Sequence, residues 1–227
     1  MICCATFLWH TQQLKRAGQI VNKVLETNQG SLAALTLKGW IYFATQKDDL
    51  QQKALAYYEQ ALDENQGGNP KQLEALLGKA KVLEKAKKYD ECIQILSEIT
   101  VLYPTFQPAI IEKGKMHIQN GDWDQAIENI TMVLVKDKQN VEAIRIYCFF
   151  LLARENDMDL LMEKFDELVA AMRAREGRNA EFIFNISRLF ARFCGRRNLV
   201  ISKTLQILEM AMAQQPDSAP FLTELGF

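Results

Sequence analysis

A pattern of bulky and small residues that returns every 34 positions constrains this chain more than any other feature. Tyr89 is matched by Trp123 in the next turn of the pattern, and Cys92 is matched by Ala126. A fixed period of this size marks an array of similar helical units, each burying its apolar face only against its neighbours. Only 11 glycines and 5 prolines interrupt the chain, which favours an all-helical array. Such a stack presents a long surface, so the pattern indicates partner binding.

The order of residue types matches the tetratricopeptide pattern, in which two antiparallel helices cross at small residues. In the unit that ends at Pro104, the first helix supplies Leu76, Ala80 and Leu83, and the second supplies Cys92, Leu96 and Ile99. Small residues at a crossing let two helix backbones approach to about 8–10 Å. We therefore predict an all-α tetratricopeptide-repeat solenoid, a right-handed superhelix of antiparallel helix pairs.

The repeat runs through the whole chain and predicts one continuous array over residues 1–227, with about six and a half units on this period. In the second unit, Ala54, Tyr58 and Ala61 take the second-helix positions if three residues are inserted in the turn before them. Insertions of this kind in loops cost little. The predicted units are 1–28, 32–66, 73–104, 107–138, 141–175, 179–216 and a partial unit 218–227.

Composition and motifs exclude several function classes. The net charge of −1 gives no basis for non-specific binding to nucleic acid, and no apolar run reaches the roughly 20 residues of a membrane span. Nucleotide-binding loops and the zinc-protease motif are absent from the sequence, so we expect no enzyme activity, no cofactor and no small-molecule substrate. His10 and His117 are interpreted as structural. The five scattered cysteines are interpreted as small core residues in a reducing compartment.

The positions that line the concave groove of such arrays are largely apolar here. Six of them form our candidate partner-binding groove: Trp40, Phe43, Lys81, Ile111, Lys115 and Phe149. An apolar groove with isolated lysines suits an amphipathic helix or another solenoid. Clamps that hold a peptide carboxylate need polar residues at these positions, which disfavours a clamp. The alternative is that superhelical winding buries the same side chains inside the array.

Three arginines are spaced by four residues and therefore share one helix face: Arg188, Arg192 and Arg196. One interpretation of this basic stripe is a docking site for an acidic protein surface or a lipid phosphate. The other is an ordinary solvated face that is partly balanced by Glu176 and Glu181.

Short segments outside the generic repeat pattern resemble the tetratricopeptide repeat protein 21 family. They occur in family order across nearly the whole chain, and they include Phe7-Leu8-Trp9, Asp122-Trp123-Asp124, Cys194-Gly195-Arg196 and Thr223-Glu224-Leu225-Gly226. Because family members are several times longer, the chain resembles their N-terminal part and is expected to be a fragment.

The resemblance implies a subunit of intraflagellar transport complex A, which acts in retrograde transport and in the entry of membrane receptors into cilia. It further implies other complex A subunits as partners, and the cytoplasm and cilium (axoneme and ciliary base) as the location. The alternative is a peptide-binding tetratricopeptide adaptor or co-chaperone without a ciliary role.

Overall fold

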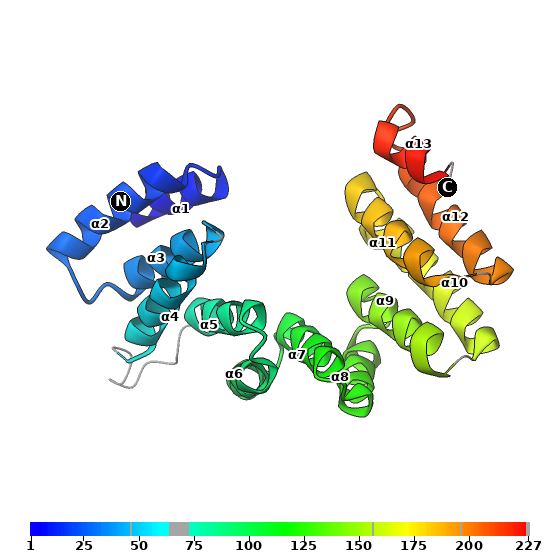
Figure 1. Cartoon of the computed structure of the whole chain (residues 1–227), viewed down its shortest axis with the longest axis horizontal. Helices are drawn as coiled ribbons and strands as arrows, with labels where there is room; N and C mark the ends of the chain where they lie inside the picture. The colour runs from blue at the N-terminus through cyan, green and yellow to red at the C-terminus, as the bar shows by residue number, and fades with distance from the viewer. Residues whose placement is uncertain (46, 64–72, 156, 196, 226–227) are drawn as a thin grey trace. The chain divides into compact units, whose positions relative to one another are not determined.

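The computed structural model describes residues 1–45, 47–63, 73–155, 157–195 and 197–225. Within these ranges the chain forms thirteen α-helices and one π-helical turn, with no strand (Figure 1). Four residues that carried predictions lie outside the described residues, namely Gln66, Arg196, Gly226 and Phe227. The all-α character of the predicted fold is confirmed.

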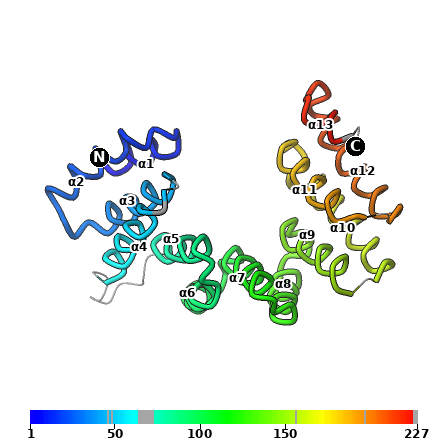
Figure 2. Tube along the Cα trace, in the orientation of Figure 1, coloured from blue at the N-terminus to red at the C-terminus, as the bar shows by residue number. Residues whose placement is uncertain are grey.

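The described helices belong to two compact units, Met1–Asp122 and Trp123–Phe227. In the first unit, each helix packs against the next along the chain, so the backbone runs up and down in antiparallel pairs (Figure 2). Its helices are α1 (Ile2–His10), α2 (Leu14–Thr27), α3 (Leu32–Ala44), α4 (Asp48–Asp63), α5 (Leu73–Lys85), α6 (Tyr89–Leu102) and α7 (Gln107–Gln119).

The second unit contains α8 (Trp123–Lys136), α9 (Val141–Phe150), α10 (Met158–Arg175), α11 (Ala180–Phe193), α12 (Asn198–Met212) and α13 (Ala219–Leu225). A π-helical turn, Leu151–Glu155, follows α9. Side-chain caps begin three of these helices, because Asn140, Asp157 and Asn179 each accept a hydrogen bond from a backbone N–H in the first turn.

Small residues lie where helices pack, as the repeat pattern predicts. Ala54, Tyr58 and Ala61 are completely buried, as expected for the second-helix positions assigned to them in the second unit. In the next pair, the Cys92 thiol of α6 donates a hydrogen bond of 3.3 Å to the carbonyl oxygen of Ala80 in α5. The division of the chain into six and a half units stays a prediction.

The interpretation of all five cysteines as core residues was wrong for two of them. Cys92 and Cys148 are buried, and burial raises the pKa of the Cys92 thiol to about 12. Cys3 and Cys4 are exposed, because α1 completely buries only Ala5 against its neighbours. The thiol of a buried cysteine is inert at neutral pH.

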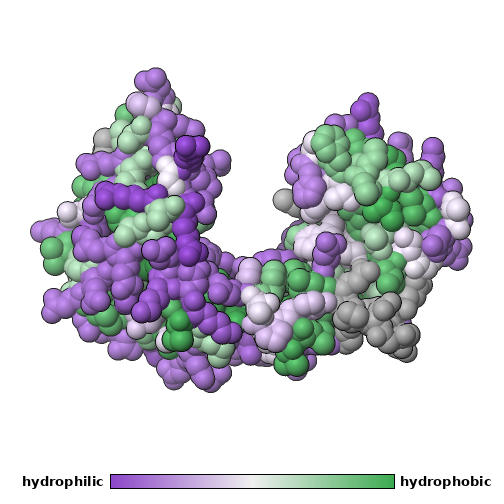
Figure 3. Space-filling model, turned by 180° about the vertical axis from the view of Figure 1, so that it is seen from behind, coloured by the Kyte–Doolittle hydropathy of each residue, from purple (hydrophilic) through white to green (hydrophobic). Residues whose placement is uncertain are grey.

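Several large apolar side chains are exposed, and apolar patches interrupt the polar surface in Figure 3. The exposed set is Met1, Phe7, Val101, Leu102, Met132, Val135, Phe193, Leu199, Leu205 and Leu222. None of the helices in the described ranges is both long and apolar enough to cross a membrane.

Candidate partner-binding surfaces

The aromatic part of the predicted groove lies on α3. The Trp40 ring lies 6.0 Å from Trp9, 5.8 Å from Phe43 and 5.8 Å from Tyr58, measured between centroids. Tyr58 belongs to the core, whereas Trp40 and Phe43 are partly exposed. Trp40 therefore joins the core to the surface, and its exposed part can contact an apolar group of a partner.

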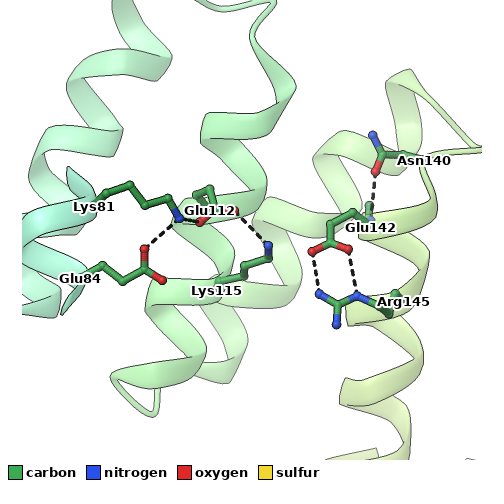
Figure 4. Close-up of polar contacts among 8 residues, drawn as sticks. Lys81, Glu84, Glu112, Lys115, Asn140, Glu142 and Arg145 are labelled. Carbon is green, nitrogen blue, oxygen red and sulfur yellow. Dashed lines mark hydrogen bonds and ion pairs between the residues drawn. The ribbon is translucent and has the colours of Figure 1, made fainter. Parts of the chain in front are cut away.

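The sequence predicts that Lys81 and Lys115 are isolated charges in the groove, but both lysines form ion pairs. The Lys81 ammonium lies 2.8 Å from Glu84 and 2.6 Å from Glu112, and Lys115 lies 2.9 Å from the other oxygen of Glu112 (Figure 4). This ionic network joins α5 to α7 across 31 residues of sequence, a pairing that repeat spacing alone does not indicate. Both lysines therefore form ion pairs with carboxylates within the array.

The network shifts the pKa of two of its members. Burial raises the pKa of the Glu112 carboxyl, but hydrogen bonds from Lys81 and Lys115 outweigh burial and hold that pKa below its ordinary value. Burial likewise lowers the pKa of Lys81, while its hydrogen bonds to Glu112 and Glu84 raise that pKa by more. Glu112 and Lys81 are therefore both charged at neutral pH.

Ile111, also assigned to the groove, lies in the core with 5 % of its surface exposed. Ile111 is therefore buried inside the array, as the alternative interpretation predicted. Partner binding by Trp40, Phe43, Lys81, Lys115 and Phe149 stays a prediction.

In the second unit, charged and aromatic side chains share α9. The Arg145 guanidinium makes two hydrogen bonds to Glu142, of 2.6 and 2.9 Å, and so neutralises that carboxylate (Figure 4). Phe149 stacks on Trp123 with a centroid distance of 6.2 Å and meets Phe193 of α11 edge-on at 5.0 Å. The Phe193 side chain is about half exposed, so this aromatic group reaches the surface.

The structure describes two of the three arginines of the basic stripe. Arg188 is half-buried with its guanidinium 6.0 Å from the Phe184 ring centroid, Arg192 is exposed, and Arg196 lies outside the described residues. Arg188 and Arg192 have no acidic partner in the described part of the chain. Their role in docking stays a prediction.

Both histidines lie where helices end. His117 is buried, with Nδ1 3.6 Å from an Asp122 carboxylate oxygen and no partner for Nε2 among the described residues. His10 is exposed, and its ring lies 4.6 Å from that of Trp9. No group of three His, Cys, Asp or Glu side chains able to hold a metal occurs in the described ranges.

These surfaces belong to a helical-repeat scaffold, in which first helices carry paired charges and aromatic groups over a core of small residues. Comparison with known proteins identifies the family. Residues 1–127 match a family model described as the tetratricopeptide repeat protein 21 N-terminal ARM repeat, and residues 163–227 match the second ARM domain of the same protein. The chain belongs to the tetratricopeptide repeat protein 21 family.

Relatives agree with this assignment, and a solved structure shares the fold. Tetratricopeptide repeat protein 21B of Homo sapiens is 35% identical over 97% of the chain, and protein 21A of Mus musculus is 27% identical over 97%. The chain spans 16% of the length of each of these two relatives. The solved structure of PilF from Pseudomonas aeruginosa, at 18% identity, covers 99% of this chain and 95% of its own with a TM-score of 0.66. The likeness to PilF concerns the fold, and it confirms the predicted fold class.

Sequence reasoning missed the ionic network on α5 and α7, and it left the position of Ile111 open between the groove and the core. Opposite charges at Lys81 and Glu112 are visible in the sequence, but their approach depends on how α5 packs beside α7. The sequence also places a lysine directly before the small crossing residue of the first helix in three units, at Lys38, Lys79 and Lys113.

Proposed function

We propose that this chain is a protein-binding segment of an intraflagellar transport complex A subunit. In this role it holds sister subunits during retrograde ciliary transport and the entry of membrane receptors into cilia, in the cytoplasm and at the cilium. The observation that carries the proposal is membership of the tetratricopeptide repeat protein 21 family, with 35% identity to the human 21B protein over 97% of the chain.

The surface chemistry is consistent with a scaffold. Charged residues on α5, α7 and α9 are neutralised within the array, and the aromatic side chains Trp40, Phe149 and Phe193 are partly or largely exposed. Exposed aromatic side chains suit a surface that buries apolar area against another protein, since aromatic residues are enriched at interfaces.

The test is affinity purification of the tagged 227-residue chain from ciliated cells, with co-purifying proteins quantified by mass spectrometry. We expect other complex A subunits at near-stoichiometric amounts. Chaperones or ubiquitin-ligase subunits in their place would support the adaptor alternative and contradict the proposal. A chain unfolded by replacing buried Tyr58 with Asp serves as the control for non-specific capture.

A further inference from the structure

In the described ranges, three equivalent depressions lie between successive second helices of the helix pairs. We call each one a furrow, bounded by two second helices and floored by the first helix between them. The furrow between α2 and α4 has a volume of about 400 Å³ over α3, and the furrow between α4 and α6 has about 340 Å³ over α5. The furrow between α8 and α10, over α9, is larger, at about 560 Å³.

In the two smaller furrows a lysine from the floor helix lies against one wall. Lys38 of α3 donates a hydrogen bond to Asn22 of α2 and lies 5.1 Å from the Tyr57 ring centroid. Lys79 of α5 makes an ion pair of 3.1 Å with Glu59 of α4. In both cases an aliphatic stem lies in the furrow, and the charged end binds an acceptor on the preceding second helix.

The α8–α10 furrow lacks this lysine. Lys38 and Lys79 come directly before the small crossing residue of their helix, and the residue at that place in α9 is Tyr147, before Cys148. The furrow is therefore bounded by side chains of other kinds, which are Thr131, Leu134, Val135, Lys138, Gln139, Tyr147, Lys164, Glu167, Ala170 and Ala171.

Leu134, Val135, Ala170 and Ala171 give this furrow an apolar part, and its charged side chains are two lysines and one glutamate, namely Lys138, Lys164 and Glu167. Val135 is 75 % exposed, so its side chain is available to an apolar group in the furrow. Lys164 is paired with both oxygens of Glu167, at 2.7 and 2.9 Å. Lys138 lines the same furrow, is exposed, and has no acidic partner in the described part of the chain.

We propose that the α8–α10 furrow binds a short protein segment that presents bulky aliphatic side chains next to a carboxylate. The smaller furrows receive an aliphatic stem with a cationic end, which pairs with an acceptor on the wall. Here the segment between α8 and α9 supplies the cation, Lys138, so the complementary ligand carries the opposite charge at the end of its aliphatic part. This surface goes beyond the complex A role and does not depend on it.

The test is a nuclear magnetic resonance titration of the full chain with two blocked peptides, acetyl-Leu-Leu-Glu-amide and acetyl-Leu-Leu-Gln-amide. We expect the glutamate peptide to shift the resonances of Val135, Tyr147 and Ala170. It should bind about threefold to fivefold more tightly than the glutamine peptide at low salt, the range that an exposed ion pair supplies. High salt should remove that difference.

Two substitutions and a matched control locate the effect. Lys138→Gln should abolish the preference for the glutamate peptide, whereas Lys136→Gln, with the same charge change on an exposed neighbour outside the furrow, should preserve it. Tyr147→Lys installs the residue that the smaller furrows contain, and its aliphatic stem should weaken binding of the uncharged glutamine peptide while circular dichroism stays unchanged.

Three results would overturn the proposal. The first is equal affinity for the two peptides, which would contradict the charged end of the ligand. The second is the absence of shifts at Val135 and Ala170, which would contradict the furrow as the site. The third is dimerisation of the chain that Tyr147→Lys reverses, which would assign the furrow to a second copy. None of these results depends on complex A, so failure here and failure of the proposed function are distinguishable.

Discussion

Tyr58 shows at the scale of one residue how the small positions of the repeat work. Its ring is completely buried between α3 and α5, and a glycine faces it from each helix. A Cβ atom at Gly39 would lie 2.5 Å from the ring carbon Cε1, and one at Gly78 would lie 2.8 Å from the hydroxyl oxygen. Only glycine leaves room for the Tyr58 ring at these two positions. The ring can therefore fill the space between three helices.

Replacing one of these glycines should destabilise the chain. We expect Gly78→Ala to lower the free energy of unfolding by about 1–3 kcal/mol, because the new methyl group overpacks a filled site. Urea denaturation monitored by circular dichroism measures the change. Gly18→Ala in α2 is the control, since a Cβ there meets nothing within 4 Å, and it should stabilise by about 0.5–1 kcal/mol. Equal effects of the two substitutions would refute the packing around Tyr58.

The Tyr58 hydroxyl is a separate matter, because it is buried and has no hydrogen-bond partner among the described residues. Burial raises the pKa of Tyr58, so the group stays protonated. An unsatisfied buried hydroxyl costs about 1–3 kcal/mol. We therefore expect Tyr58→Phe to leave the thermal unfolding midpoint unchanged or to raise it. A clear fall in that midpoint would mean that the hydroxyl makes a stabilising interaction.

At the scale of helices, the ionic network between α5 and α7 predicts a pH dependence. The pKa of Glu112 is lowered on folding, so the folded state binds fewer protons than the unfolded state near that pKa. The stability that the charged Glu112 carboxylate contributes is therefore present above its unfolded-state pKa, and it is lost as the pH falls through its folded-state pKa. We expect Glu112→Gln to cost about 0.5–1 kcal/mol at pH 7, given the partial exposure of the network.

The measurement is chemical denaturation of wild type and Glu112→Gln between pH 7 and about pH 3, a range that spans the ordinary carboxyl pKa. The difference in unfolding free energy should shrink toward zero at the acidic end. Glu209→Gln, which changes an exposed carboxylate on α12, should have little effect throughout. A pH-independent difference for Glu112→Gln would show that the carboxylate charge is not what the network uses.

The basic stripe on α11 makes a prediction about association. If Arg188 and Arg192 dock an acidic surface, replacing both with Gln should slow binding to complex A subunits and flatten its salt dependence, because rim charges act mainly on the association rate. Arg173→Gln with Arg178→Gln removes the same charge from exposed arginines off the stripe and should have no effect. Identical kinetics for the two double variants would leave the stripe a solvated face.

Much of the helical architecture could be predicted from the sequence, because the pattern of small and bulky residues directly reports which face of each helix is buried. Ala54 and Ala61 were placed in the core on this basis, and Cys92 was placed at a crossing. Side-chain pairings between helices were beyond reach. The contact of Lys81 with Glu112 depends on the rotation of α5 against α7, and the burial of Ile111 depends on how its neighbours wind around α7.

At the scale of the whole molecule, the chain is a short part of what its relatives contain, since it spans 16% of the length of human protein 21B. Its own surface must therefore carry any binding that the isolated chain performs. A repeat array folds by contacts between neighbouring units, which allows a segment to present its surface without the remainder.

The central claim is that this surface holds other complex A subunits. The direct measurement is size-exclusion chromatography with light scattering of the purified 227-residue chain mixed with purified complex A subunits, followed by calorimetric titration. We expect a one-to-one complex with at least one subunit and a Kd below about 1 μM, as for a stable scaffold interface. Separate elution from every subunit, with binding limited to short peptides, would contradict the claim.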